Sequence, residues 1–265
     1  MIELENLVTE LAAAAKAAAV AVMEIYEDST RWAVVQKADD SPLTAADGRA
    51  HEIIEAHLAA AYPDVLIVSE EGDEGLWAKR CAAERFFLID PIDGTQEFID
   101  RDVHFSVNLA YVERGRVRAG CLLFPALGEL YTGFEGGGAR LEYLQSGNVV
   151  PLRVSNFSLK DTGLRVVCSR SRHNAQTAAF IERLHKARKT HIGASMKFMH
   201  VAAGNAEMYP RFGSAMKEWD VAASQAIVEA AGGSVVLPQT GQTLEYGKTV
   251  DIVVRDFLAQ GRVID

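Results

Sequence analysis

The sequence predicts a mixed α/β fold, and three observations support this prediction. Near the N-terminus, apolar residues recur at every third or fourth position over about twenty residues, as in an amphipathic helix. Short apolar runs bounded by turn residues recur through the chain and are typical of buried strands. Strands follow one another directly from residue 105 to residue 144 and alternate with helices after residue 150. We therefore expect an N-terminal α+β half, residues 1–150, and a C-terminal α/β half, residues 151–265.

In the first half, periodicity predicts a helix over residues 7–25 and a second helix that ends near Ala61. Thr44 is a good N-cap for the second helix, and Asp47 three residues later completes a capping-box-like pair. The loop at 38–42 lies between the two helices. Strands are expected at 31–37, 65–68, 86–89, 105–111, 116–124, 129–134 and 140–144.

In the second half, Ser195 and Asp220 are predicted to be the N-caps of two helices. Glycines close both helices, at Gly204 and at Gly232. The expected helices cover 174–187, 196–203 and 221–231, and the expected strands cover 164–168, 206–209, 235–237 and 251–254.

The composition excludes several classes of protein. The chain has 265 residues, is 49% hydrophobic and carries a net charge of −9. This length allows a sizeable core, and the negative charge argues against a nucleic-acid or anionic membrane surface as the main partner. An anionic substrate would therefore need local positive charge, from metal ions or from a few placed Lys and Arg residues.

The cysteines and the N-terminus indicate a cytoplasmic protein. The cysteine count is odd and the spacing is wide, which favours reduced thiols over disulfides or a zinc site. The first residues are acidic where a signal peptide would be basic, and Lys16 and Glu24 interrupt the Ala-rich run. Peripheral association with the inner membrane is left open. The three cysteines are Cys81, Cys121 and Cys168.

Four apolar residues run directly into Asp90, where we expect a buried strand to end because Pro91 cannot donate to a sheet. Asp90 and Asp93 would then lie together, with the Ile92 carbonyl between them and the Thr95 hydroxyl just beyond. Such oxygen ligands suit a hard cation such as Mg²⁺. The alternative is an Asp-rich turn whose side chains bond to the backbone.

Three more acids stand at the ends of predicted elements. Glu70 follows a second buried strand, while Asp47 and Asp220 stand at helix starts. Each has an ordinary explanation, as solvated surface or as a helix cap. Together they favour one acidic site, and such a cluster of carboxylates is costly without cations because like charges repel.

Three motifs resemble the inositol monophosphatase family of Mg²⁺-dependent, Li⁺-sensitive phosphatases. They are the Glu70-Glu71 pair, DPIDGTQEFI at 90–99 and WDVAASQAIVEAAGG at 219–233. The resemblance covers nearly the whole chain. It implies a layered α/β/α/β/α sandwich of the inositol monophosphatase and fructose-1,6-bisphosphatase type.

The resemblance also implies a role for each acid. Glu70, Asp90 and the Ile92 carbonyl would bind one Mg²⁺ ion. Asp90, Asp93 and Asp220 would bind a second ion, and Glu70 would also touch a third where one is present. The implied cofactor is therefore two or three Mg²⁺ ions, with Asp90 as the bridging ligand.

The same resemblance implies catalytic and phosphate-binding residues. Thr95, oriented by Asp47, would help to take a proton from the attacking water, and Glu70 belongs to the catalytic set. The backbone amides of Gly94 and Thr95 would hold a phosphate oxygen. The segment 37–47 resembles the mobile loop and helix start of the family.

Within the family, SRSRHN at 169–174 and the segment 193–213 resemble the bacterial 3′(2′),5′-bisphosphate nucleotidases, as do Glu97 and Phe98. This branch implies hydrolysis of the 3′-phosphate of 3′-phosphoadenosine 5′-phosphate to give AMP. A second phosphate needs a cationic partner away from the metals, and Arg suits bidentate contact. The candidate substrate contacts are Ser169, Arg170, Lys197 and Arg211.

Two other functions remain open on the sequence alone. One is an inositol monophosphatase or a broad sugar phosphatase that uses the same metal site. The other is a non-catalytic regulator, which the intact ligand and relay positions count against. Gln96 and His104 depart from the nucleotidase pattern near the expected substrate site. The expected partner is a small phosphorylated molecule, and the oligomeric state, a homodimer included, is left open.

Overall fold

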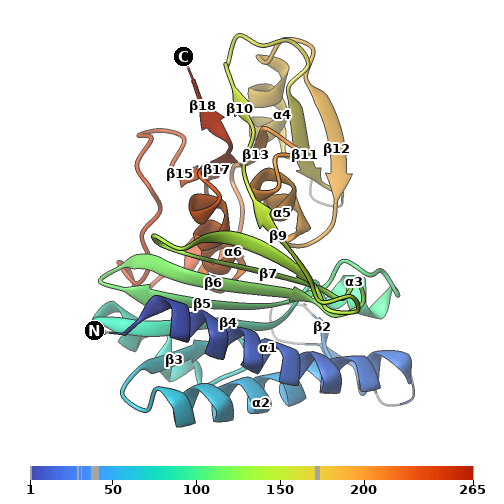
Figure 1. Cartoon of the computed structure of the whole chain (residues 1–265), viewed down its shortest axis with the longest axis vertical. Coiled ribbons are helices and arrows are strands. Elements are labelled where there is room, and N and C mark those ends of the chain that lie inside the picture. Colours follow the sequence, from blue (N-terminus) through green and yellow to red (C-terminus); the bar gives the residue numbers. More distant parts are fainter. Residues whose placement is uncertain (1, 29, 31, 37–41, 171–173, 265) are drawn as a thin grey trace.

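The computed structural model describes residues 2–28, 30, 32–36, 42–170 and 174–264, and these form five layers (Figure 1). Two helices cover one face of a seven-stranded sheet. Two further helices separate this sheet from a five-stranded sheet, and one short helix packs on the outer face of the second sheet. The layered α/β/α/β/α sandwich predicted from the sequence is confirmed.

The outer helices α1 (Leu4–Glu27) and α2 (Ala45–Ala61) agree with the periodicity of the sequence. Their buried faces pack against each other and against the sheet. Thr44 caps α2, and the capping box with Asp47 is present as predicted. Of the helices in the described part of the chain, none combines the length and apolar character needed to cross a membrane.

The seven-stranded sheet has the strand order β3-β4-β5-β6-β7-β8-β9. Its first two strands are parallel, and every later pair is antiparallel, so the predicted meander is confirmed. The meander is one strand longer than expected, because the chain pairs once more after residue 147. The strands are β3 (Leu66–Ser69), β4 (Arg85–Asp93), β5 (Ser106–Glu113), β6 (Arg116–Phe124), β7 (Glu129–Phe134), β8 (Gly138–Tyr143) and β9 (Asn148–Leu152).

The prediction that β4 ends at Asp90 is wrong, because the strand continues to Asp93. Within the described residues, β3 pairs with β4 only as far as Ile89, so no strand on that side needs the N–H group that Pro91 lacks. On the other side, the register with β5 shifts between Asp90 and Asp93, as in a β-bulge. The irregularity directs the end of the strand toward the site described below.

The middle layer contains α5 (Met196–Ala202) and α6 (Glu218–Ala230). Helix α6 lies very close to the sheet: a Cβ atom at Gly120 would stand 2.3 Å from the Ala223 carbonyl oxygen. The predicted N-cap of this helix is wrong by three residues. Lys217 is the N-cap, and Asp220 is the third residue of the helix, where its side chain accepts from the Lys217 N–H group.

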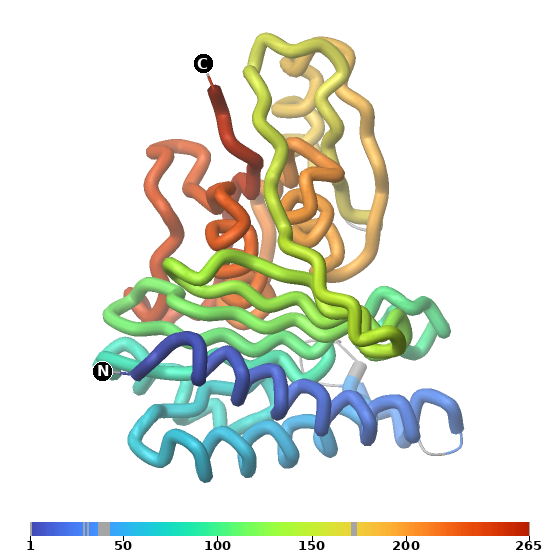
Figure 2. The backbone as a smooth tube through the Cα atoms, in the orientation of Figure 1, coloured from blue at the N-terminus to red at the C-terminus, as the bar shows by residue number. Residues whose placement is uncertain are grey.

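The five-stranded sheet has the order β12-β11-β13-β17-β15, with β11 parallel to both of its neighbours. Helix α4 (Ala175–Glu182) is shorter than the predicted helix, because the chain turns back at Lys186, which has a positive φ, to form β12. Figure 2 shows the chain passing from the first sheet to this one after β9. The strands are β11 (Arg165–Ser169), β12 (Arg188–Ile192), β13 (Met208–Arg211), β15 (Ser234–Val236) and β17 (Phe257–Gln260).

Three short strand pairs complete the described fold. The predicted strand at 31–37 is reduced to two residues, and most of the predicted loop at 38–42 lies outside the described residues. The pairs are β1 (Val35–Gln36) with β2 (Pro42–Leu43), β10 (Asn156–Phe157) with β18 (Arg262–Val263), and β14 (Met216–Lys217) with β16 (Val253–Val254).

The close approach of α6 to the sheet gives a first prediction. We expect Gly120→Ala to lower the free energy of unfolding by about 1–3 kcal/mol, because the added methyl group must push the Ala223 backbone away. Gly48→Ala is the matched control: it lies in α2 with open space around it, and it should raise stability by up to about 1 kcal/mol. Chemical denaturation measures both values, and equal stability of the two variants would contradict the packing described.

Candidate metal and phosphate site

Three carboxylates meet where β3, β4 and α6 converge. Glu70, Asp90 and Asp220 each offer one carboxylate oxygen, and these three oxygens lie within 4.8 Å of one another. Asp90 reaches this place because side chains alternate along β4. It shares a face with Phe86 and Leu88, whose side chains belong to the core beneath α6. The sequence prediction that these three acids form one site agrees with this arrangement.

The acidic cluster formed by Glu70, Asp90 and Asp220 is electrostatically costly without a cation. Asp90 is only 2% exposed, and burial, followed by repulsion from Glu70, Asp93, Asp220 and Asp47, raises its pKa well above the usual value. Burial and repulsion also raise the pKa of Asp220. A divalent cation would remove this cost, and an all-oxygen set of carboxylates is the kind of site that Mg²⁺ and similar ions prefer. The residues present therefore fit a bound metal.

Asp93 lies near the acidic cluster but is not part of its compact core. It contributes to the raised pKa of both Asp90 and Asp220, so it shares their electrostatic field. One of its oxygens, Oδ2, accepts a hydrogen bond of 2.5 Å from the Ser195 hydroxyl. Ile92, the other predicted metal ligand on this strand, has a carbonyl that accepts from the Thr95 hydroxyl at 3.2 Å.

The predicted pair of Thr95 and Asp47 is brought together by the fold. The Thr95 hydroxyl lies 3.3 Å from Asp47 Oδ1. The other oxygen of Asp47 accepts from the Thr44 N–H at 2.7 Å and from the Thr44 hydroxyl at 2.6 Å. Asp47 thus caps α2 with one oxygen and faces Thr95 with the other. Gly94 takes a left-handed φ of 90°, which lets the chain turn from β4 into the short helix α3 (Thr95–Ile99).

Two of the predicted substrate residues, Lys197 and Arg211, are buried cations. Their exposed fractions are 5% and 7%, so neither side chain is an ordinary surface charge. The Lys197 ammonium donates to the carbonyls of Ile192 and Ala194 and stands 5.3 Å from the centre of the Tyr209 ring. Burial lowers its pKa to about 8, although Asp93 and Glu97 oppose this effect.

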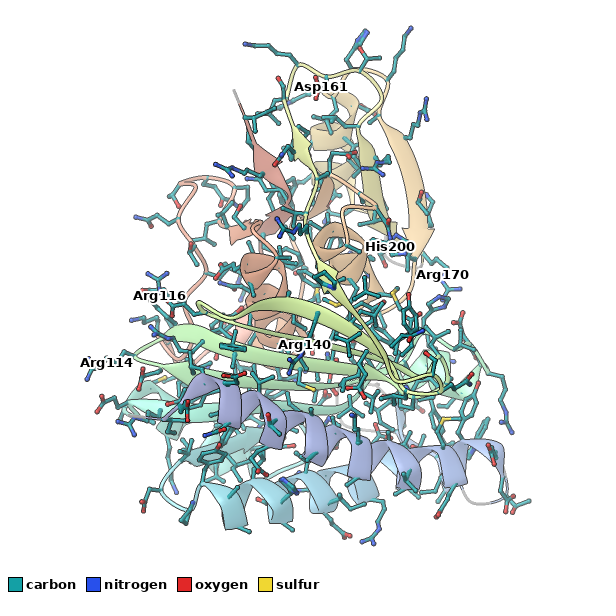
Figure 3. The ribbon with its side chains drawn as sticks, viewed as in Figure 1. Arg114, Arg116, Arg140, Asp161, Arg170 and His200 are labelled. Carbon is teal, nitrogen blue, oxygen red and sulfur yellow. The ribbon has the colours of Figure 1, made fainter. Side chains whose placement is uncertain are left out.

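Arg170 joins this group from the end of β11. Its guanidinium forms an ion pair of 2.7 Å with Asp102, and it lies between the second sheet and the α3 end of the first (Figure 3). Glu97 lies among these charges: burial, then Asp93, raise its pKa, while Lys197 and Arg170 oppose the rise. We refer to Arg170, Lys197 and Arg211 as the cationic wall, because both arginines lie close enough to Lys197 to lower its pKa.

The remaining predicted positions are placed as follows. Ser169 is the last residue of β11, and its carbonyl accepts from the His191 ring. Residues 171–173 of the predicted nucleotide segment lie outside the described residues. The two departures from the nucleotidase pattern both pair locally: Gln96 with Asp100, and His104 with Asp102.

Sequence reasoning missed a buried ion pair that supports the acidic cluster. Arg80 is 1% exposed, and its Nε donates to Glu218 at 2.8 Å. The guanidinium also donates to the Thr249 carbonyl at 3.0 Å. The pair therefore ties the segment after Glu70 to the first turn of α6, two residues before Asp220. Its sequence signal is weak, because a lone Arg and Glu 138 residues apart resemble any two surface charges.

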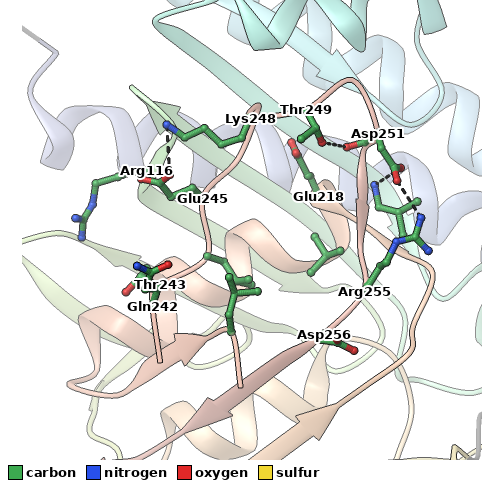
Figure 4. A pocket seen from close by; sticks show the side chains of 14 residues that line it. Arg116, Glu218, Gln242, Thr243, Glu245, Lys248, Thr249, Asp251, Arg255 and Asp256 are labelled. Carbon is green, nitrogen blue, oxygen red and sulfur yellow. Dashed lines mark hydrogen bonds and ion pairs between the residues drawn. The ribbon is translucent and has the colours of Figure 1, made fainter. Parts of the chain in front are cut away.

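A separate pocket of about 790 Å³ is lined in part by Glu218 (Figure 4). Its lining contains none of the carboxylates of the acidic cluster. Two ion pairs lie within its lining, Lys248 with Glu245 and Arg255 with Asp251. Arg116, which lines it, lies at the end of the first sheet opposite α3 (Figure 3). The acidic cluster, rather than this pocket, is the candidate site for phosphate chemistry.

The cost of burying Asp90 gives a second prediction. In the presence of a chelator at pH 7, we expect Asp90→Asn to raise the melting temperature by about 2 °C or more, because it removes a buried negative charge from the acidic cluster. With excess Mg²⁺ the order should reverse, since only the wild type gains stability from the ion. Asp64→Asn, at an exposed turn, is the control and should leave the melting temperature unchanged both with chelator and with excess Mg²⁺.

The raised pKa also predicts a pH dependence. The folded protein holds the Asp90 proton more tightly than the unfolded chain does. The stability of the metal-free protein should therefore fall as pH rises from the ordinary carboxyl range through the raised pKa. Asp90→Asn should flatten this slope in thermal unfolding. An identical slope in both proteins would contradict the assigned burial cost.

Comparison with known proteins agrees with the geometry of this site. The 3′(2′),5′-bisphosphate nucleotidase CysQ of Escherichia coli K12 is 38% identical over 226 residues, which cover 85% of this chain and 88% of that protein. The crystal structure of CysQ from Bacteroides thetaiotaomicron, a bacterial member of the inositol monophosphatase family, matches with a TM-score of 0.80 and 32% identity, covering 96% of this chain and 97% of that one.

A relative named for a different activity is also similar. The fructose-1,6-bisphosphatase/inositol-1-monophosphatase of Thermotoga maritima is 35% identical over 197 residues, which are 73% of this chain and 70% of that protein. The model of the inositol monophosphatase family matches residues 3–264. The resemblance predicted from the three sequence motifs is thus confirmed, and this chain belongs to the inositol monophosphatase family.

Proposed function

We propose that this protein is a Mg²⁺-dependent 3′(2′),5′-bisphosphate nucleotidase that converts 3′-phosphoadenosine 5′-phosphate and water to AMP and phosphate. One observation carries the proposal: Asp93 raises the pKa values of Asp90 and Asp220 in the acidic cluster and also acts on Lys197, which lies close to Arg170 and Arg211 in the cationic wall. The acidic cluster can hold cations for the scissile phosphate, and the cationic wall can hold a separate anionic group. The names of the CysQ relatives support the same substrate.

The metal ligands in this proposal come mainly from residues 1–150. Glu70, Asp90 and the Ile92 carbonyl would hold one Mg²⁺ ion, and Asp90, Asp93 and Asp220 would hold a second. Glu70 is also available to a third. Bound Mg²⁺ would neutralise the phosphate dianion and make water more acidic. Residues 151–265 would supply Asp220 and the residues that select the nucleotide.

Thr95 and Asp47 would handle the proton of the attacking water. The Thr95 hydroxyl lies within hydrogen-bond distance of two acceptors, the Ile92 carbonyl at 3.2 Å and Asp47 Oδ1 at 3.3 Å, and can donate its one proton to either. Because Thr44 holds the other oxygen of Asp47, the carboxylate cannot turn away. Thr95 can therefore accept a proton from water while its own proton moves toward Asp47.

The substrate would be held at its two anionic ends. The backbone amides of Gly94 and Thr95 would bind an oxygen of the scissile phosphate, at the turn where β4 becomes α3. Lys197, Arg211 and the Ser169-Arg170 segment would bind the nucleotide and its other phosphate. Arg170 would exchange its ion pair with Asp102 for the substrate.

An inositol or sugar phosphatase is the second candidate function, and the Thermotoga maritima relative favours it. It would use the same metal ligands without the cationic wall. A non-catalytic regulator is a weaker alternative, because the relay pair and the acidic cluster are both assembled. A cytoplasmic location is part of the proposal, and the three free cysteines support a reducing compartment.

The direct test is phosphate release with Mg²⁺ from 3′-phosphoadenosine 5′-phosphate, inositol 1-phosphate and fructose 1,6-bisphosphate in parallel, with and without Li⁺. We expect kcat/KM to be at least tenfold higher for the nucleotide, and Li⁺ to inhibit. A preference for inositol 1-phosphate would keep the metal site but overturn the substrate assignment. No release from any of the three would favour the regulator.

The pKa of Lys197 gives a further prediction on this assay. As pH rises through about 8, Lys197 loses its charge, so KM for the nucleotide should rise above pH 8 while KM for inositol 1-phosphate should not. Lys197→Ala should raise KM by about tenfold or more and remove this pH dependence. Lys160→Ala, on an exposed turn, is the control and should change neither KM for the nucleotide nor its pH dependence.

A further inference from the structure

We infer that Ser195 is a positioning residue that fixes the carboxylate of Asp93 for metal binding. This inference rests on the proposed metal site and adds a residue that the ligand set does not contain. Ser195 is the residue immediately before α5, whereas Asp93 is the last residue of β4. Its hydroxyl therefore joins two parts of the chain that are 102 residues apart.

The geometry of Ser195 argues for a dedicated contact. A serine before a helix usually accepts from a backbone N–H of the first turn. Ser195 makes no such cap bond and instead donates to Asp93 Oδ2 at 2.5 Å. The side chain is 1% exposed, so water cannot replace it freely. Bonds from a hydroxyl to a carboxylate are charge-assisted and among the strong hydrogen bonds.

A buried chain of donors fixes the direction of this hydrogen bond. The Asn108 amide donates to Ser195 Oγ at 3.3 Å, and the Ser106 hydroxyl donates to the Asn108 carbonyl at 2.7 Å. Both residues are 0% exposed. They are two apart on β5 and so face the same side of the sheet. Because Asn108 donates to the oxygen of Ser195, the Ser195 proton is directed to Asp93.

The consequence for the site follows from which oxygen is held. With Oδ2 bonded to Ser195, Asp93 presents Oδ1 to a cation, and its side chain loses less rotational freedom when an ion binds. Ser195 is also two residues before Lys197 of the cationic wall. The contact thus connects the segment that would hold the nucleotide to a carboxylate that would hold metal.

The test uses Ser195→Ala in the full chain and measures Mg²⁺ and Mn²⁺ binding to the metal-free protein by titration calorimetry. We expect about tenfold weaker binding of the ion that Asp93 holds, which is typical when the partner of a metal ligand is removed. Phosphate release should fall at low Mg²⁺ and recover at high Mg²⁺. Ser214→Ala is the matched control, since it removes a buried hydroxyl that donates to the Val254 carbonyl.

A double-mutant cycle separates positioning from a general structural role. If Ser195 acts through Asp93, Ser195→Ala should cause no further loss of metal affinity in an Asp93→Asn background. An additional loss there, or wild-type metal affinity in the single variant, would overturn the inference. Failure of the proposed function is distinguishable: the wild type would then release no phosphate from the nucleotide, whatever Ser195→Ala does to metal binding.

Discussion

The burial of several carboxylates at one meeting point of strands and helix is the constraint on which this structure depends. Asp90 sits almost fully inside the protein among Glu70, Asp93 and Asp220, and every one of these neighbours raises its pKa. Like charges in a place of low polarity are costly unless a cation joins them. The surrounding fold holds the carboxylates together despite this cost.

Several features of the fold can be understood as support for the acidic cluster. The glycine-lined face of the sheet allows α6 to come close and brings Asp220 over β4. The buried Arg80–Glu218 pair fixes the first turn of α6 against the segment after Glu70. The capping box holds Asp47, and the buried Ser106–Asn108–Ser195 chain ends on Asp93. Each of these contacts holds a residue of the site in place.

The elements that carry the acids could be predicted from local signals in the sequence, whereas the layered arrangement was implied by the resemblance of three motifs to a known family. Apolar runs that end in Asp90 or Glu70 mark strands, and Thr44 with Asp47 marks a helix start whatever its surroundings. The meander was readable from its turns. The extension of β4 past Pro91 could not be predicted. It depends on where β3 stops pairing with β4, and the local sequence does not show this.

The supports of the site could not be predicted, because they connect residues far apart in the chain. Ser195 had the local pattern of a helix cap, and only the position of Asp93 shows that its hydroxyl is used elsewhere. The burial of Lys197 could not be predicted either, since a single lysine in the sequence carries no sign of burial. Ser106 and Asn108 offered the one available signal: two polar residues on the same face of an otherwise apolar strand.

The central claim is that metal ions replace protons on buried carboxylates, and proton release on Mg²⁺ binding tests it most directly. Titration calorimetry of the metal-free protein near neutral pH, in buffers of different ionisation enthalpy, counts the protons released. The account predicts saturable Mg²⁺ binding with proton release, lost in Asp90→Asn, because an ion binds the deprotonated carboxylates of Asp90 and Asp220, whose pKa values burial and repulsion raise in the metal-free protein. Absence of saturable binding, or binding with no released protons, would contradict it.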